Sequence, residues 1–184
     1  MGCEHSDVRP PAISIRIALV GRKGSGKSAL LSAFLRKSYD CTPTSSNQVG
    51  VKAYTFSDSA TVTTLEVWEV SQGLVARGYN VVLLVLDAGL TAKEMSEDIA
   101  LYGDMLRTQG RLGVLSIVVT KSDTVAESAE VLKRKGRESC NLGLSPRIYV
   151  TSAKSQHGIE AMFRDFARPM AVSRSVSLRT SLDD

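Results

Sequence analysis

Short apolar runs alternate with segments of mixed polarity along most of the 184-residue chain. Four apolar runs rich in β-branched residues predict buried strands at 13–20, 81–86, 115–119 and 148–150. Two further runs, 49–56 and 61–70, predict strands that pair as a hairpin across 57–59. Continuous apolar strands are typical of a parallel sheet that helices cover on both faces.

Apolar residues at helical spacing follow most of these strands and predict helices at 28–37, 96–108, 126–137 and 158–167. This alternation predicts an α/β fold, in which helices flank a mostly parallel sheet with one antiparallel hairpin strand. Ligands of such sheets bind at the carboxyl ends of the strands. We expect one domain over 13–170, a flexible N-terminal lead-in over 1–12 and a flexible tail over 171–184.

Composition narrows the possible partners. The net charge is +4, but the basic residues are scattered and only 5% of residues are aromatic, which argues against nucleic acid as a partner. The three cysteines show neither a disulfide pattern nor zinc spacing. No apolar run approaches the roughly 20 residues that a membrane-spanning helix needs, so a cytoplasmic location is expected.

The turn after the first predicted strand reads GRKGSGKS, a complete G-x-x-x-x-G-K-[ST] motif between a strand and a helix. Its glycines allow successive backbone N–H groups to face an anion, and the helix dipole adds positive potential. Lys27 is expected to neutralise the β- and γ-phosphates, and the Ser28 hydroxyl to ligate Mg²⁺. This motif alone does not distinguish ATP from GTP. The predicted phosphate-binding residues are Gly21, Lys23, Gly24, Ser25, Gly26, Lys27, Ser28 and Ala29.

Two later strand ends carry TKSD at 120–123 and TSAK at 151–154. Together with the phosphate motif, they resemble the [N/T]-K-x-D and S-A-K motifs of the Ras/Rab/Arf-like small GTPase superfamily, over about 13–170. The resemblance implies a P-loop NTPase fold and GTP or GDP as ligand. It also implies that Asp123 accepts hydrogen bonds from guanine, that Lys121 lies over the base, and that the Ala153 N–H meets the guanine oxygen. The implied base-binding residues are Thr120, Lys121, Asp123, Ser152, Ala153 and Lys154.

The segments that sense the γ-phosphate in that superfamily depart from its pattern. The first aligns on NQVGV, 47–51, and puts Gln48 where a Thr ligates Mg²⁺. Thr42 or Thr44 could substitute only if the loop folded in another register. In the second, VWEVSQG, Glu69 replaces the Asp that holds Mg²⁺ through water. Glu69 is therefore expected to serve with Ser28 as a metal ligand.

The catalytic position of the second segment also differs. The family Gly that contacts the γ-phosphate aligns with Gln72 or, after a one-residue slip, with Gly73. Either register removes the catalytic Gln. About ten residues separate Trp68 from the strand at 81, so the usual switch helix is predicted to be shortened or absent. Lys23 stands where a small residue normally admits an arginine finger.

These departures predict GTP hydrolysis that is feeble or absent, without an identifiable catalytic residue. Related enzymes that retain the Gln turn over at only ~10⁻⁴ per second, and an arginine finger adds ~10³–10⁵-fold. A chain that lacks both contributions cannot time a signalling cycle by itself.

The N-terminus, MGCEHS, matches the myristoylation signal M-G-x-x-x-[ST]. We predict myristate on Gly2 and palmitate on Cys3, because one myristoyl chain alone holds only marginally to a bilayer. The expected location is therefore peripheral on a membrane surface, reached through the N-terminal acyl chains.

Three functions remain open on the sequence. The leading interpretation is a guanine nucleotide-binding small GTPase-like protein that recruits a protein effector or complex to a membrane. The second is a pseudo-GTPase scaffold in which nucleotide is structural or absent. A third, an ATP-using P-loop kinase, lacks an obvious acceptor site or lid and conflicts with TKSD.

Overall fold

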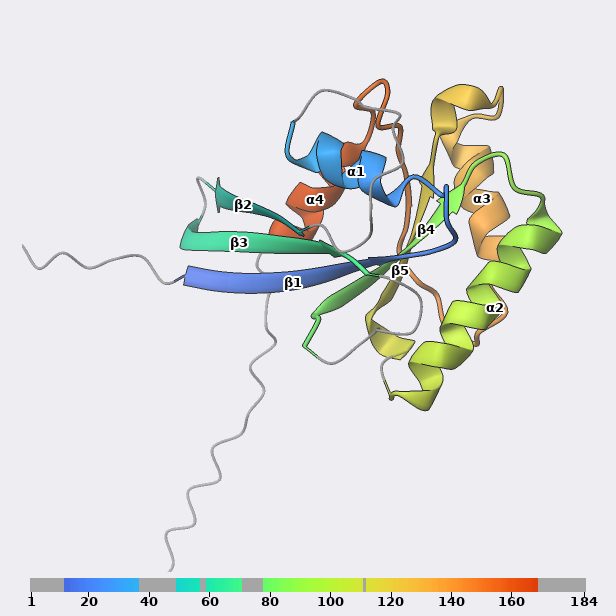
Figure 1. Cartoon of the computed structure of the whole chain (residues 1–184), viewed down its shortest axis with the longest axis horizontal. Helices are drawn as coiled ribbons and strands as arrows, with labels where there is room; N and C mark the ends of the chain where they lie inside the picture. The colour runs from blue at the N-terminus through green and yellow to red at the C-terminus, as the bar shows by residue number, and fades with distance from the viewer. Residues whose placement is uncertain (1–11, 37–48, 57–58, 71–77, 111, 169–184) are drawn as a thin grey trace, which may run out of the picture.

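The computed structural model describes residues 12–36, 49–56, 59–70, 78–110 and 112–168. Within these ranges six strands form one sheet in the order β2-β3-β1-β4-β5-β6 (Figure 1). Strand β2 is antiparallel to β3, and the other neighbouring pairs are parallel. The strands are β1 (Ala12–Val20), β2 (Val49–Phe56), β3 (Ser59–Glu69), β4 (Val81–Asp87), β5 (Leu115–Thr120) and β6 (Ile148–Val150). The predicted α/β architecture with one antiparallel hairpin strand is confirmed.

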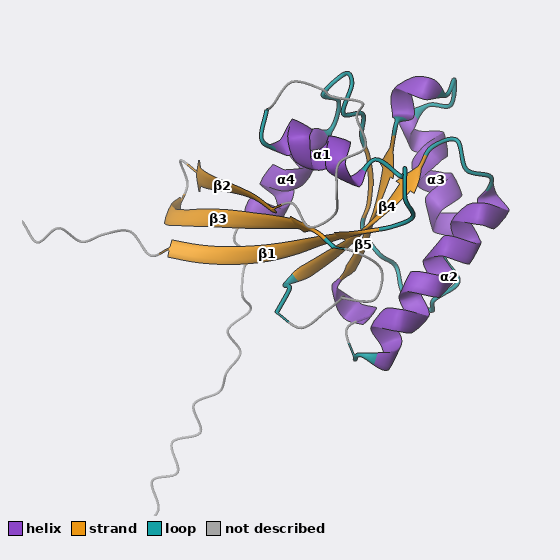
Figure 2. Ribbon diagram, viewed as in Figure 1, coloured by secondary structure: helices purple, strands orange, loops and turns teal. Residues whose placement is uncertain are grey.

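Helices cover both faces of this sheet (Figure 2). Helices α1 (Lys27–Phe34) and α4 (Ile159–Ala167) pack on one face, and α2 (Ala92–Thr108) and α3 (Ala129–Glu138) on the other. Two 3-10 turns, Leu112–Val114 and Ser122–Thr124, precede and follow β5. Among the described residues, no helix has the length and apolarity that crossing a membrane requires.

The continuous apolar strands are explained by the two cores. In β1, Ile17 and Leu19 join the core under α1 and α4, whereas Ala18 and Val20 join the core under α2. Side chains alternate between the faces of a strand, so a strand covered on both sides needs apolar residues at every position.

Two helix starts differ from the sequence prediction for a local reason. Helix α2 begins four residues before the predicted 96, because Thr91 and Glu94 form a capping box. The Glu94 N–H donates to Thr91 Oγ1 at 3.3 Å, and the Thr91 N–H donates to the Glu94 carboxylate at 2.8 Å. Helix α3 begins at Ala129 rather than 126, because the Ser128 hydroxyl accepts from the Val131 N–H at 3.4 Å.

Several sequence predictions lie outside the described residues. These are the lead-in before Ala12, the tail after Arg168, the hairpin turn at 57–58 and the segments 37–48 and 71–77. The hairpin itself is confirmed by the pairing of β2 with β3, in which Val49 lies opposite Trp68.

Candidate nucleotide-binding site

Three loops meet at the carboxyl edge of the sheet. They follow β1, β5 and β6, which run parallel to one another, so their last residues lie at the same edge. A pocket of about 260 Å³ opens between these loops. All of its lining residues except Thr124 belong to the predicted nucleotide-binding set: Gly26, Ala29, Thr120, Lys121, Asp123, Ala153 and Lys154.

The loop after β1 needs its glycines for two different reasons. Gly21 has φ 145°, and an added Cβ would lie 2.4 Å from the carbonyl oxygen of Val85 on β4. Gly26 has φ 99° at the start of α1, and its Cβ would lie 3.1 Å from the Thr120 hydroxyl. Residues with a Cβ rarely adopt these angles. At Gly21 there is no room for a Cβ, and at Gly26 a Cβ would fit only if the Thr120 side chain shifted slightly. The loop is therefore pressed against β4 and β5.

Lys27 folds back over this loop. Its Nζ donates to the carbonyl oxygens of Gly21 at 2.9 Å and Arg22 at 2.8 Å. Burial lowers the pKa of the Lys27 ammonium, and the nearby Glu69 carboxylate opposes that effect. A phosphate that entered the loop would offer this ammonium anionic oxygens in exchange for the two carbonyls.

Thr120 joins the base loop to the phosphate loop. Its hydroxyl lies 2.6 Å from the Ser25 carbonyl oxygen and 3.0 Å from that of Leu86, and the residue is only 4% exposed. One hydroxyl hydrogen serves both acceptors, and the shorter contact is the one to the phosphate loop. Thr120 thus holds the two loops together while its side chain lines the pocket.

The base loops orient their charged groups through neighbours. Ser152, fully buried, donates from Oγ to Asp123 Oδ1 at 2.5 Å and accepts from the Ser155 N–H at 3.1 Å. Lys121, with φ 57°, directs its Nζ to Asp87 Oδ2 at 2.7 Å, and Asp87 Oδ1 accepts from the Gly89 N–H at 2.9 Å. Asp123 and Lys121, the two side chains predicted to contact guanine, both line the pocket.

A model described as the Ras family matches residues 16–172. The chain belongs to the Ras family. No curated protein matches it. The family match establishes a GTP-binding small GTPase, and Ras-family proteins generally bind GTP or GDP with Mg²⁺ and engage effector proteins.

Ser28 and Glu69, the two residues predicted to ligate Mg²⁺, lie side by side in the structure. Ser28 Oγ donates to Glu69 Oε1 at 3.0 Å, from the start of α1 to the end of β3. Glu69 is 8% exposed, and its Oε2 atom is buried and accepts no hydrogen bond from a described residue. Hydroxyl and carboxylate oxygens are the donors that Mg²⁺ prefers, and one or two protein groups plus phosphate oxygens are its usual set. The residues present fit this ion.

The structure adds three residues that sequence reasoning missed. Asp87 fixes Lys121, as described above. Arg22 occupies a variable position of the phosphate motif, and its Nε donates to Asp98 Oδ1 on α2. The spacing of Met95, Asp98 and Tyr102 was the available signal for Asp98: an acidic residue occupies a face of the helix that is otherwise buried and apolar.

Not every predicted site residue can be located. Gln48, Gln72 and Gly73 lie outside the described residues, as do the lipidation candidates Gly2 and Cys3. Lys23 and Lys154 are exposed, Lys23 on the phosphate loop and Lys154 on the rim of the pocket.

Proposed function

We propose that this Ras-family protein holds guanine nucleotide and Mg²⁺ at the three-loop edge, hydrolyses GTP feebly or not at all, and recruits a protein effector or complex to a membrane. The observation that carries the binding part is the convergence of the phosphate loop, Asp123 and Ala153 on one pocket, with Thr120 bonded across to Ser25. Phosphate, base and cation contacts all require that shared edge.

Ser28 and Glu69 would hold the cation, which neutralises phosphate charge when bound. The chain's own contributions are separate from it. Lys27 supplies a positive charge beside the phosphates, and the helix α1 that begins at this residue adds the positive end of its dipole. Asp123, oriented by Ser152, supplies carboxylate oxygens to the base.

We infer weak hydrolysis from the sequence, at the positions that align with the catalytic residues of the superfamily. The catalytic position falls on Gly73 or, after a one-residue slip, on Leu74, and neither carries the side-chain amide that orients the attacking water in related enzymes. Lys23, in place of a small residue, is expected to obstruct the approach of an arginine finger. Single-turnover phosphate release from purified protein loaded with GTP tests this directly. We expect a rate below ~10⁻⁴ per second, and a rate above ~10⁻³ per second contradicts the proposal. The Lys27→Ala variant, purified in parallel by the same protocol, measures the phosphate released by contaminating GTPases.

Membrane attachment through Gly2 and Cys3 rests on the N-terminal sequence MGCEHS. Mass spectrometry of the N-terminal peptide from cells should find myristate on Gly2 and a thioester-linked acyl chain on Cys3. The Gly2→Ala protein should appear in the soluble fraction. An unmodified glycine in the native peptide contradicts this part of the proposal alone.

A pseudo-GTPase scaffold is the second candidate, and one specific observation favours it. The phosphate loop is held by protein contacts: Lys27 bonds to Gly21 and Arg22, and Ser25 bonds to Thr120. A loop held in this way can keep its shape as part of a docking subunit. Purified protein that releases no nucleotide on denaturation, or that binds GDP and a GTP analogue equally without changing conformation, would favour the scaffold over the switch.

A further inference from the structure

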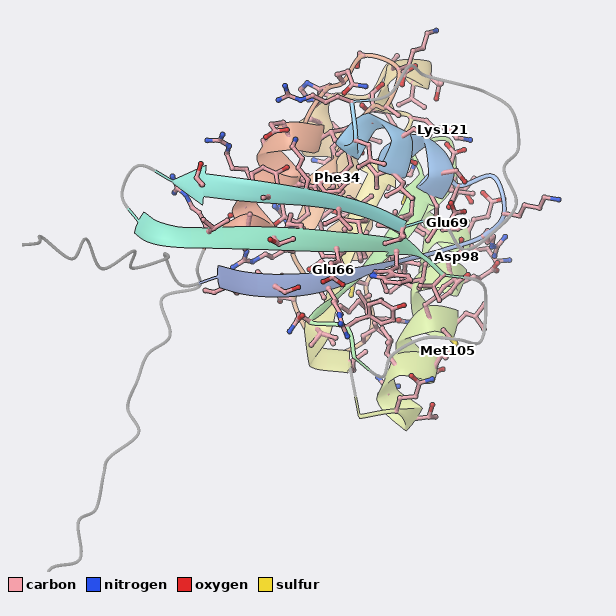
Figure 3. All side chains as sticks on the ribbon, turned by 60° about the vertical axis from the view of Figure 1, so that its left-hand side comes forward. Phe34, Glu66, Glu69, Asp98, Met105 and Lys121 are labelled. Atoms are coloured by element: carbon pink, nitrogen blue, oxygen red, sulfur yellow. The ribbon has the colours of Figure 1, made fainter. Side chains whose placement is uncertain are left out.

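An ion pair ties the phosphate loop to α2. The Arg22 guanidinium donates from Nε to Asp98 Oδ1, across 76 positions of sequence. The Asp98 side chain is 2% exposed and that of Arg22 is 47% exposed, so the carboxylate is buried and its partner reaches it from the surface. Figure 3 labels Asp98 at the end of the sheet where Glu69 also lies.

A buried carboxylate is costly unless a donor or cation satisfies it. Within the described part of the chain, Arg22 is the cation in ion-pair contact with Asp98. The nucleotide contacts derived above use neither residue. The described contacts of Asp98 therefore point to one role for this buried acid, which is to hold the phosphate loop through Arg22.

The main chain of Arg22 links this pair to the phosphate site. Its carbonyl oxygen accepts from Lys27 Nζ at 2.8 Å and from the Ser25 N–H at 3.2 Å. Arg22 therefore does two things: its side chain binds Asp98, and its main chain forms the turn of the loop and positions the Lys27 ammonium. Any displacement of Arg22 would move both contacts.

A second anchor holds the opposite end of the same turn. The Ser25 carbonyl oxygen lies 2.6 Å from the buried Thr120 hydroxyl on β5. Between the anchors lies Gly24, whose φ is 81° and whose missing Cβ would meet no atom within 4 Å. The loop is fixed at Arg22 and Ser25, and its tip faces open space.

We propose that Arg22 and Asp98 are positioning residues for phosphate binding, which hold the loop from α2 so that its N–H groups and Lys27 face the β-phosphate before the nucleotide arrives. This inference rests on the proposed nucleotide binding. Neither residue needs to touch the nucleotide. The ion pair orders the loop before the nucleotide binds, so binding does not have to supply that ordering free energy. Arginine suits this role, since its planar guanidinium presents several donors in a fixed geometry.

The test compares GDP with GMP, because only GDP carries the β-phosphate that the loop is built to hold. Affinities for both nucleotides are measured on the full-length protein and on the double variant Arg22→Met/Asp98→Leu, which removes both charges and leaves no unpaired buried acid. We expect GDP affinity to fall about tenfold, the equivalent of one charge-assisted hydrogen bond, and GMP affinity to change less than about twofold. A purely structural loss would weaken both nucleotides alike.

Arg107→Met is the matched control. This substitution removes an arginine of α2 whose partner is the exposed Asp104 and not the phosphate loop. The ratio of GDP affinity to GMP affinity should therefore equal that of the parent. A double variant with a parent-like melting transition and an unchanged ratio overturns the proposal. If the double variant does not fold, Asp98→Asn replaces it, because this variant keeps an oxygen acceptor for Arg22. The ratio of GDP affinity to GMP affinity should then fall by less than in the double variant, and an unchanged ratio also overturns the proposal. A parent that binds neither nucleotide refutes the proposed function instead.

Discussion

The two sides of the nucleotide site are built differently. On the base and phosphate side, each loop is fixed to a neighbour, through Thr120 to Ser25, Ser152 to Asp123 and Arg22 to Asp98. On the side that should sense the γ-phosphate, the described part of the chain contains Glu69. The other positions that align with the switch segments, Gln48, Gln72 and Gly73, lie outside the described residues. The residues aligned with the switch Thr and the catalytic Gln have changed identity.

This contrast indicates that holding a nucleotide and cleaving it depend on separable groups. Only interactions that strengthen in the transition state accelerate a reaction, so the loss of a water-orienting amide need not weaken ground-state binding. The predicted binding residues lie on loops that the sheet itself brings together, whereas hydrolysis requires a few individual side chains. A chain can therefore keep the first set while the second diverges.

Replacing Lys27 with Ala is expected to have the largest effect, because it removes the ammonium from the phosphate side. GDP affinity should fall roughly a thousandfold, as expected when one partner of a desolvated charge pair is truncated. Titration of a fluorescent GDP analogue measures it. Lys93→Ala, an exposed lysine on α2, serves as the control. Parent-like affinity in Lys27→Ala would break the comparison, since the holding side would then not hold phosphate.

Thr120→Val tests the link between the base loop and the phosphate loop. The substitution keeps the shape but removes the hydroxyl that contacts the Ser25 and Leu86 carbonyl oxygens. Leaving buried acceptors without this donor should lower the free energy of unfolding by about 1–2 kcal/mol and speed GDP release. Urea unfolding and nucleotide-release kinetics measure the two effects. Thr120→Ser should behave as the parent does, and a fully stable Val variant would rule out the link.

Glu69→Gln asks whether the sensing side still holds its cation. Loss of the carboxylate charge should weaken Mg²⁺ binding to the GDP complex by about tenfold or more, whereas Glu69→Asp keeps the charge and should lose less. Titration of Mn²⁺ into the GDP complex, followed by electron paramagnetic resonance, reads the metal directly without hydrolysis. If the Gln variant binds Mn²⁺ as tightly as the parent does, Glu69 is not a ligand of the cation.

The smallest expected effect comes from Asp87→Asn, which releases Lys121. The side chains of this ion pair are 27% and 41% exposed, so solvent screens it. GDP affinity should fall only about two- to threefold, and the difference should shrink as salt is added. Equilibrium titrations at low and high ionic strength check both points. A loss beyond about tenfold would show that Asp87 acts on the nucleotide itself rather than on Lys121.

Much of the fold and the phosphate loop was predictable from local patterns, and the base-binding residues of the pocket from the resemblance to the small GTPase superfamily. The apolar runs predicted the strands because both cores require apolar residues on each face of the sheet. The start of α2 was missed although Thr91 and Glu94 form a recognisable T-x-x-E signal. Asp98 was missed although its helical spacing places it between buried residues, because acidic residues are rarely buried and only the tertiary structure shows that Arg22 is its partner.

The sequence by itself determined the alternating α/β order and the phosphate motif, since each depends on neighbours within a few positions, and its resemblance to the small GTPase superfamily pointed to the base-binding residues of the pocket. The tertiary structure alone decided the pairing of Arg22 with Asp98, of Thr120 with Ser25 and of Lys121 with Asp87, which lie 76, 95 and 34 positions apart. Such contacts depend on how helices and strands pack. A hydrogen bond between side chains forms only at short distances that no local pattern encodes.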